Sequence, residues 1–194
     1  YMRYIRNIIN NAISDNLTDN YPFKKFKIKT EVTRNRNLSV VSMRAIRDYQ
    51  TEIKRQVIAK DIFMLQFFLL GINLKDLFYL TPDDIIEGRL QFHRAKTGRF
   101  YNIKIEPEAQ KILDKYKGIR YLLWFADHCE SERTGQSTKH ARQSSFQYKD
   151  ETAFTKMVNN NLFDIQKALK INSSVKITSY YCRHSVASIL RELS

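Results

Sequence analysis

Residues 56–77, QVIAKDIFMLQFFLLGINLKDL, lie near the middle of the chain and decide the kind of fold. Residues 56–70 are apolar on almost every side of a helix, which is typical of a helix at the centre of a core. The apolar run contains Gln66 and is shorter than the about 20 residues that cross a bilayer, so it predicts a buried helix and no membrane span. Gly71 ends this helix, and residues 74–80 predict one or two further helical turns.

The next segment outward predicts a β-hairpin with strands at 89–94 and 100–105. Tyr101, Ile103 and Ile105 alternate with polar residues at the strand period, and Thr97-Gly98 supplies turn residues. A helix is expected to begin at Pro107, where a missing amide hydrogen is tolerated. Its buried face would consist of Ala109, Ile112, Leu113 and Tyr116.

The C-terminal part predicts a long loop at 127–149 and then two helices. The first has apolar residues at helical spacing: Phe154, Val158, Leu162, Ile165 and Leu169. The second begins near Thr178 or Ser179 and continues past Leu190. The expected fold class is therefore mainly α with a small antiparallel β-hairpin sheet (α+β).

The N-terminal part predicts a helix, a linker and the start of a second domain. The helix carries one apolar stripe: Ile5, Ile8, Ile9, Ala12 and Ile13. Residues 21–37 predict an extended basic linker, because Pro22 biases its neighbour away from helix. Ser39 is the expected N-cap of a helix that runs to Tyr49. We therefore expect 1–20 to end a preceding domain and 38–194 to form the main domain.

The composition favours a polyanionic partner. The chain has 33 Lys+Arg against 20 Asp+Glu, a net charge of +13, and 43% hydrophobic residues, so it is globular and strongly basic. Nucleic acid or a membrane surface fits this charge. Two cysteines, Cys129 and Cys182, make no disulfide framework and favour a reducing, cytoplasmic location. The densest basic run is either a solvated linker or a phosphate contact, and it comprises Lys24, Lys25, Lys27, Lys29, Arg34 and Arg36.

Two short motifs carry candidate chemistry. The hairpin tip, 94–99, reads RAKTGR and places three cations on a tight turn. It is either an ordinary solvated turn or a contact between phosphates. Residues 180–185, YYCRHS, open the last helix, and helix N-termini attract anions. They are either a packed aromatic pair with a surface arginine or a phosphate site.

In this order the motifs resemble the tyrosine recombinase (phage integrase) family, especially integrases of bacterial mobile elements. Residues 70–77, LGINLKDL, match the family pattern T-G-x-R-x-x-E-L, and Lys96 matches the catalytic lysine. Residues 180–184, YYCRH, match H-x-x-R-H, and 185–188, SVAS, match the T-x-A-[ST] that follows. The resemblance covers essentially the whole chain. It implies that 1–20 end a core-binding domain, 21–37 connect the domains, and 38–194 form a catalytic domain.

The resemblance implies site-specific DNA recombination or integration through a 3′-phosphotyrosyl intermediate, without metal or cofactor. The partners would be double-stranded attachment-site DNA and, for the full-length enzyme, three further copies in a homo-tetramer. Lys96 would be the general acid and Arg183 the phosphate clamp, and the implied catalytic positions are Lys96, Arg183, His184, Tyr180 and Asn73. The expected DNA-binding residues are Lys24, Lys25, Lys27, Lys29, Arg34, Arg36, Lys75, Arg94, Thr97 and Arg99.

The sequence departs from the family pattern at three places. Asn73 stands at the position of the first arginine, and Tyr180 at that of the first histidine. Lys75, Arg94 and Arg99 are the candidates to replace the missing arginine. The tyrosine nucleophile would follow the last helix, so the present chain is expected to bind DNA without cutting it. Zinc is not expected, because no common zinc-site spacing is made by His128, Cys129, His140, Cys182 and His184.

Two other functions stay open at this point. One is a non-catalytic DNA-binding relative of the recombinases, which Asn73 favours. The other is an unrelated helical domain that binds nucleic acid.

Overall fold

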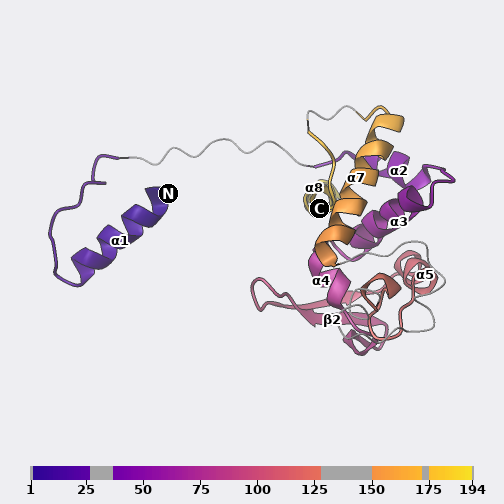
Figure 1. Ribbon diagram of the computed structural model, residues 1–194, viewed down its shortest axis with the longest axis horizontal. Coiled ribbons are helices and arrows are strands. Elements are labelled where there is room, and N and C mark those ends of the chain that lie inside the picture. Colours follow the sequence, from indigo (N-terminus) through magenta and orange to yellow (C-terminus); the bar gives the residue numbers. More distant parts are fainter. Residues whose placement is uncertain (1, 27–36, 128–149, 172–174, 194) are drawn as a thin grey trace. The chain divides into compact units, whose positions relative to one another are not determined.

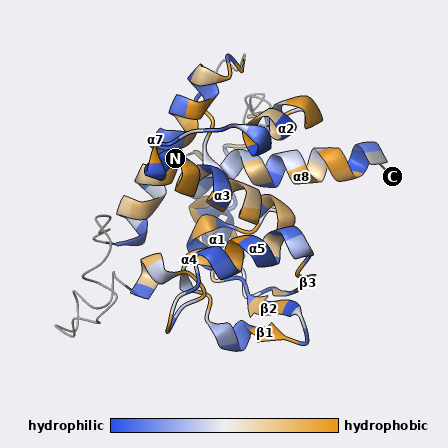
Figure 2. Ribbon diagram, turned by 90° about the vertical axis from the view of Figure 1, so that its right-hand side faces the viewer, coloured by the Kyte–Doolittle hydropathy of each residue, from blue (hydrophilic) through white to orange (hydrophobic). Residues whose placement is uncertain are grey.

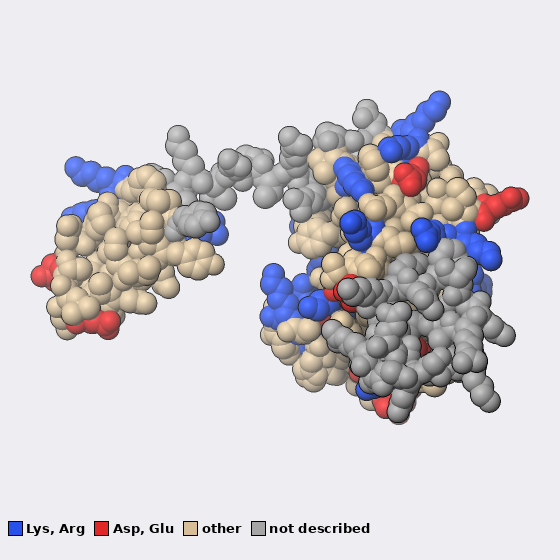
Figure 3. Space-filling model, in the orientation of Figure 1, with Lys and Arg blue, Asp and Glu red and all other residues tan. Residues whose placement is uncertain are grey.

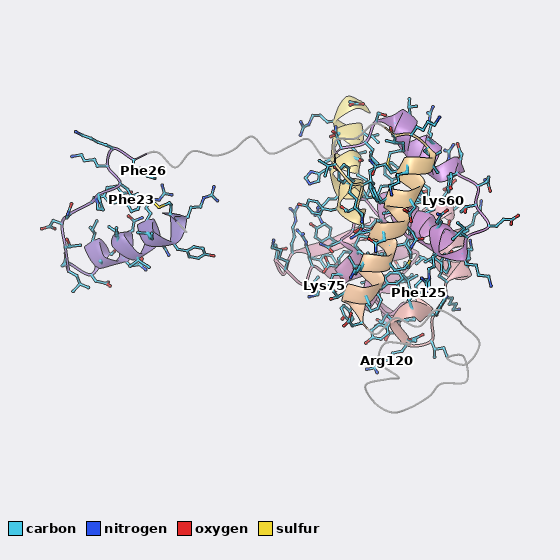
Figure 4. The ribbon with its side chains drawn as sticks, turned by 45° about the horizontal axis from the view of Figure 1, so that its top comes forward. Phe23, Phe26, Lys60, Lys75, Arg120 and Phe125 are labelled. Carbon is cyan, nitrogen blue, oxygen red and sulfur yellow. The ribbon has the colours of Figure 1, made fainter. Side chains whose placement is uncertain are left out.

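The computed structural model describes residues 2–26, 37–127, 150–171 and 175–193. The chain divides into two compact units, 1–35 and 36–194, which we describe one at a time. The first contains helix α1, Met2–Ser14, as the apolar stripe predicts. None of the residues of α1 is buried, and Ile8 is 66% exposed. Phe23 and Phe26 pack edge to face in the same unit, with ring centroids 5.9 Å apart (Figure 4).

The second unit is mostly helical with one small antiparallel sheet, as predicted (Figure 1). Its elements are α2 Val40–Asp48, α3 Lys54–Phe68, α4 Leu74–Tyr79, the 3-10 turn η1 Pro82–Asp84, β1 Ile85–Ile86, β2 Arg89–His93, β3 Phe100–Lys104, α5 Pro107–Lys115, α7 Glu151–Ala168 and α8 Ser179–Leu193. The predicted loop at 127–149 lies outside the described residues, apart from Asp127.

The sheet has three strands in the order β1-β2-β3, where the sequence predicts two. The extra strand β1 pairs with the start of β2 across a turn at Glu87-Gly88. Both turn residues have positive φ, 50° and 71°, as a tight hairpin turn requires. Two residues of strand are too few to show a period, and this is why the pattern missed β1.

Helix α3 is the central element, as its apolar sequence predicts. It packs against α2, α5, α7 and α8, and Ile62, Phe63 and Leu65 are fully buried in it. Figure 1 shows α7 running beside α3, and the contacts between these two helices agree with that view. The helix ends at Phe68, two residues before the predicted end. Leu70 turns into the left-handed region instead, with φ of 55°.

Aromatic rings join α7 to α4 and to the segment that follows α5. The ring of Phe125, labelled in Figure 4, stacks on that of Phe154 with centroids 4.9 Å apart. The ring of Phe78 in α4 lies 5.4 Å from that of Phe154. The helices of the larger unit carry both hydrophobic and hydrophilic residues (Figure 2). Of the described helices, none is both long and apolar enough to cross a membrane.

Three described helices begin with side-chain caps. The Ser39 hydroxyl accepts a hydrogen bond from the amide of Ser42 at 3.2 Å, which confirms the predicted N-cap. Asp150 caps α7 through the amide of Ala153 at 2.8 Å. The third cap is Asn73, at the start of α4.

Candidate functional site

The turn after α3 lies directly against the first part of α8. Gly71 has φ of +75°, and a Cβ added to it would lie 2.7 Å from the Cα of Arg183. No side chain fits in that space, so glycine is needed both for the backbone conformation and for the close approach. The side-chain amide of Gln66 donates a hydrogen bond to the backbone carbonyl of Ile72 at 2.8 Å and so stabilises the turn. The close approach of Gly71 to Arg183 fixes the position from which the Arg183 side chain projects from α8.

Two hollows open beside this turn, and both are lined by Gly71, Ile72, Asn73 and Arg183. The first is completed on the sheet side by Asp76, Arg94 and Tyr101, among others. The second is completed on the helix side by Ser179 and Tyr180, among others. Residues from the loop, the hairpin and the last helix, far apart in sequence, therefore meet at Arg183.

Arg183 is partly buried and held from the hairpin. Its Nη2 donates to the Tyr101 hydroxyl at 3.3 Å. The Tyr101 ring in turn stacks on Phe92 at 5.3 Å, with the planes 14° apart. The guanidinium of Arg99 lies over the same ring, 5.8 Å from its centroid. Tyr101 thus connects the hairpin to the arginine of α8.

The tip of the hairpin, residues 94–99, is tied to α4 by Asp76. One carboxylate oxygen accepts from the amide of Ala95 at 3.2 Å, and the other lies 3.8 Å from Nε of Arg94. The turn itself is closed by the Arg94 carbonyl, which accepts from the amides of Thr97 and Gly98. Lys96 is exposed on this turn. Basic side chains gather where the hairpin projects from the larger unit (Figure 3).

Asn73 acts as a helix cap. Its side-chain carbonyl accepts from the amide of Lys75 at 3.0 Å, at the start of α4. Lys75, labelled in Figure 4, is exposed. It lines a different hollow of about 200 Å³, together with Asp76 and His93. On α8, Tyr180 is 47% exposed, and its ring meets that of His184 edge to face at 4.8 Å.

The predicted site residues fall into three groups. Asn73, Arg94, Tyr180 and Arg183 line the two hollows. A second group is exposed on the hairpin, α4 and α8, and it comprises Lys75, Lys96, Thr97, Arg99 and His184. Lys24 and Lys25 are exposed in the smaller unit. Four others, Lys27, Lys29, Arg34 and Arg36, lie outside the described residues.

Sequence reasoning did not single out Tyr101, Asp76 and Gln66 as parts of the site. Tyr101 counted only as one step in a strand alternation, and nothing in that pattern says what its hydroxyl meets. Asp76 was matched to the family motif without a role. Gln66 carried a signal, because a buried amide in an apolar helix needs hydrogen-bond partners. Its oxygen is buried and has no hydrogen-bond partner.

Cys182 belongs to the core. Its thiol is fully buried and donates to the Phe63 carbonyl at 3.5 Å, and burial raises the pKa of the thiol. Within the described residues, no three His, Cys, Asp or Glu side chains form a group able to hold a metal ion. His128, Cys129 and His140 lie outside that part of the chain.

The fold is that of a tyrosine recombinase catalytic domain, as the sequence predicts. The particular structures that it resembles are those of lambda integrase. The chain matches a lambda integrase(75–356) dimer bound to a COC′ core site with a TM-score of 0.64 at 14% identity, over 97% of this chain and 62% of that one. It matches a lambda integrase tetramer bound to a Holliday junction with a TM-score of 0.63 at 14% identity, over 97% and 50%.

The chain thus spans less than two thirds of the lambda integrase structures. No protein-family model and no curated protein matches it by sequence. At this identity the likeness establishes the fold alone.

Proposed function

We propose that this chain is part of a DNA strand-exchange enzyme that cuts and rejoins DNA through a phosphotyrosyl intermediate. The observation that carries the proposal is the position of Arg183, whose neighbours in the hollows come from the 71–73 turn, the hairpin and the start of α8. The lambda integrase structures of the same fold are bound to DNA, and the net charge of +13 suits that partner.

The proposed reaction is a metal-free transesterification. A tyrosine hydroxyl loses its proton to solvent and attacks the scissile phosphorus. A bond forms between the tyrosine oxygen and the 3′-phosphate, and the bond to the 5′-oxygen breaks. Negative charge grows on the non-bridging oxygens, where the guanidinium of Arg183 stabilises it. Lys96 gives its proton to the leaving 5′-oxygen. Tyr180 and His184 supply further hydrogen bonds to the phosphate.

The wider assignment follows from the same proposal. Residues 1–20 would end a core-binding domain, 21–37 would connect it, and 38–194 would carry most of the catalytic domain. Lys24, Lys25, Lys27, Lys29, Arg34 and Arg36 would contact the DNA backbone. The full-length protein would assemble as a tetramer on two attachment sites in the cytoplasm, with a tyrosine as its nucleophile.

A second candidate is a non-catalytic DNA-binding relative. Asn73 favours it, because this side chain caps α4 and, being neutral, cannot make the bidentate hydrogen bonds to phosphate that an arginine makes. A suicide substrate made from the native attachment site separates the two candidates. A strand-transferring full-length protein forms an adduct that survives denaturation, and Lys96→Ala or Arg183→Ala abolishes it. DNA binding by the full-length protein with no adduct on the authentic site would leave the non-catalytic relative.

A further inference from the structure

The position of Asn73 leaves the candidate site one cation short. A phosphodiester in a transition state gains negative charge, and planar arginine donors match its oxygens best. Asn73 already accepts the amide hydrogen of Lys75, so it is fixed in place as a cap. Another side chain has to supply the second set of donors if Arg183 is to bind a phosphate at the mouth of the hollow.

The three candidate cations differ in where they lie. Arg94 lines the same hollow as Asn73 and Arg183. Lys75 lines the neighbouring hollow, on the other side of Asp76. Arg99 is exposed and lies over the Tyr101 ring. The geometry therefore separates Arg94 from the other two.

Arg94 is also partly buried and has a side-chain donor that lacks a hydrogen-bond partner. Its side chain is 19% exposed, and its Nε is buried without a hydrogen-bond partner. The nearest carboxylate, Asp76, lies 3.8 Å away, beyond hydrogen-bond reach, and its other oxygen accepts the amide of Ala95. A buried donor without a partner is costly, and a turn of the Arg94 side chain toward an incoming acceptor removes that cost.

The charges in the hollow point the same way. Two guanidinium groups, Arg94 and Arg183, share it with one carboxylate, that of Asp76. The positive charge is therefore not balanced from within, and a bound anion relieves the repulsion between the two arginines.

We infer that Arg94 and Arg183 together bind one phosphate group, and that Arg94 supplies from the hairpin the guanidinium that Asn73 lacks. The inference rests on the proposed function, in which that phosphate belongs to DNA. It makes β2 and the turn after it, and not the 71–73 turn, the source of the second arginine. Tyr101 then acts as a positioning residue, since it holds Arg183 beside the hairpin.

Side-chain NMR of the arginine Nε–H groups tests the inference on the 194-residue chain. Inorganic phosphate and, in a second arm, a short DNA duplex are the probes. Within each arm, the Arg94 and Arg183 signals should shift together and give the same apparent dissociation constant. An Arg94 signal that stays still while Arg183 shifts would overturn the shared site.

Variants measure the same pair through duplex affinity. Arg94→Gln should weaken binding about tenfold or more, the value of one charged hydrogen bond. Lys104→Gln removes one charge from an exposed position of the same hairpin and should cost about threefold or less, a typical surface-charge effect. Arg94→Gln should also stop the Arg183 signal from responding to phosphate, whereas Arg99→Gln should not.

A rescue experiment guards against misfolding. Asn73→Arg placed in the Arg94→Gln protein should restore most of the lost affinity, and the melting temperature shows whether each variant folds. If Arg94→Gln folds and binds like Lys104→Gln, the inference about Arg94 fails while DNA binding stands. If the unaltered chain binds no duplex even at low salt, the proposed function fails instead.

Discussion

Gly71 shows at the scale of one residue how the site depends on a missing side chain. Its φ of +75° is disfavoured for other residues, and Arg183 Cα occupies the space that a Cβ would need. The family motif places a glycine here, and the structure gives the reason: the backbone of the turn lies against the backbone of α8. The same contact sets the base of the Arg183 side chain.

Gly71→Ala should therefore destabilise the protein by about 2–5 kcal/mol, from left-handed strain and overpacking together. Gly88→Ala is the matched control, because Gly88 has φ of +71° with nothing within 4 Å of its added Cβ. The control should lose only about 1–2 kcal/mol, from strain alone. Urea unfolding of both variants gives the difference. Equal losses would show that the contact with Arg183 costs nothing.

At the scale of elements, α8 connects the core, the site and the start of the larger unit. Its Ser185 hydroxyl is fully buried, accepts from the amide of Leu38 at 2.8 Å and donates to the carbonyl of Tyr181 at 2.8 Å. Ser188, one turn later, accepts from the Asn37 side chain at 3.1 Å. The chain that leads into α2 is thus fastened to the helix that carries Arg183.

Ser185→Ala should leave the Leu38 amide buried without an acceptor, which costs about 1–3 kcal/mol. Native-state hydrogen exchange at Leu38 should speed up by the corresponding factor. Ser188→Ala serves as the control, since its partner is a part-buried side chain and the Leu38 hydrogen bond stays intact. Unchanged protection of Leu38 in Ser185→Ala would mean that the segment is held by other contacts.

At the scale of the whole molecule, the burial of one thiol and one phenol limits stability at alkaline pH. Burial raises the pKa of the Cys182 thiol, and burial followed by the hydrogen bond to Asp61 raises that of Tyr116. Both groups are neutral in the folded protein and ionise more easily when it unfolds. Their contribution is complete below the unfolded pKa values and is lost as the pH rises toward the folded ones.

The free energy of unfolding should fall above about pH 9, where an unfolded thiol ionises, by about 1.4 kcal/mol per pH unit for Cys182. Tyr116 should add to the slope above about pH 10. Urea unfolding at pH 7 to 11 measures it. Cys182→Ala should reduce the slope, and Tyr116→Phe should do so only at the higher pH values. A slope that neither variant alters would place the alkaline transition in other groups.

The sequence by itself determined the central helix, the hairpin and the last helix, because local periods of 3.6 and 2 mark them. Three family motifs in order also indicated the fold and named Arg183 as part of the site. Short strand β1 escaped detection, since two residues show no period.

Only the tertiary structure decided which side chains meet. The 71–73 turn, the hairpin and α8 are far apart in sequence, and the folded chain brings Asn73, Arg94 and Arg183 to one hollow. The sequence left Lys75, Arg94 and Arg99 as equal candidates to replace the missing arginine. A difference of a few residues within a hairpin or helix alters which surface a cation reaches, and that direction is fixed by packing and not by spacing along the chain.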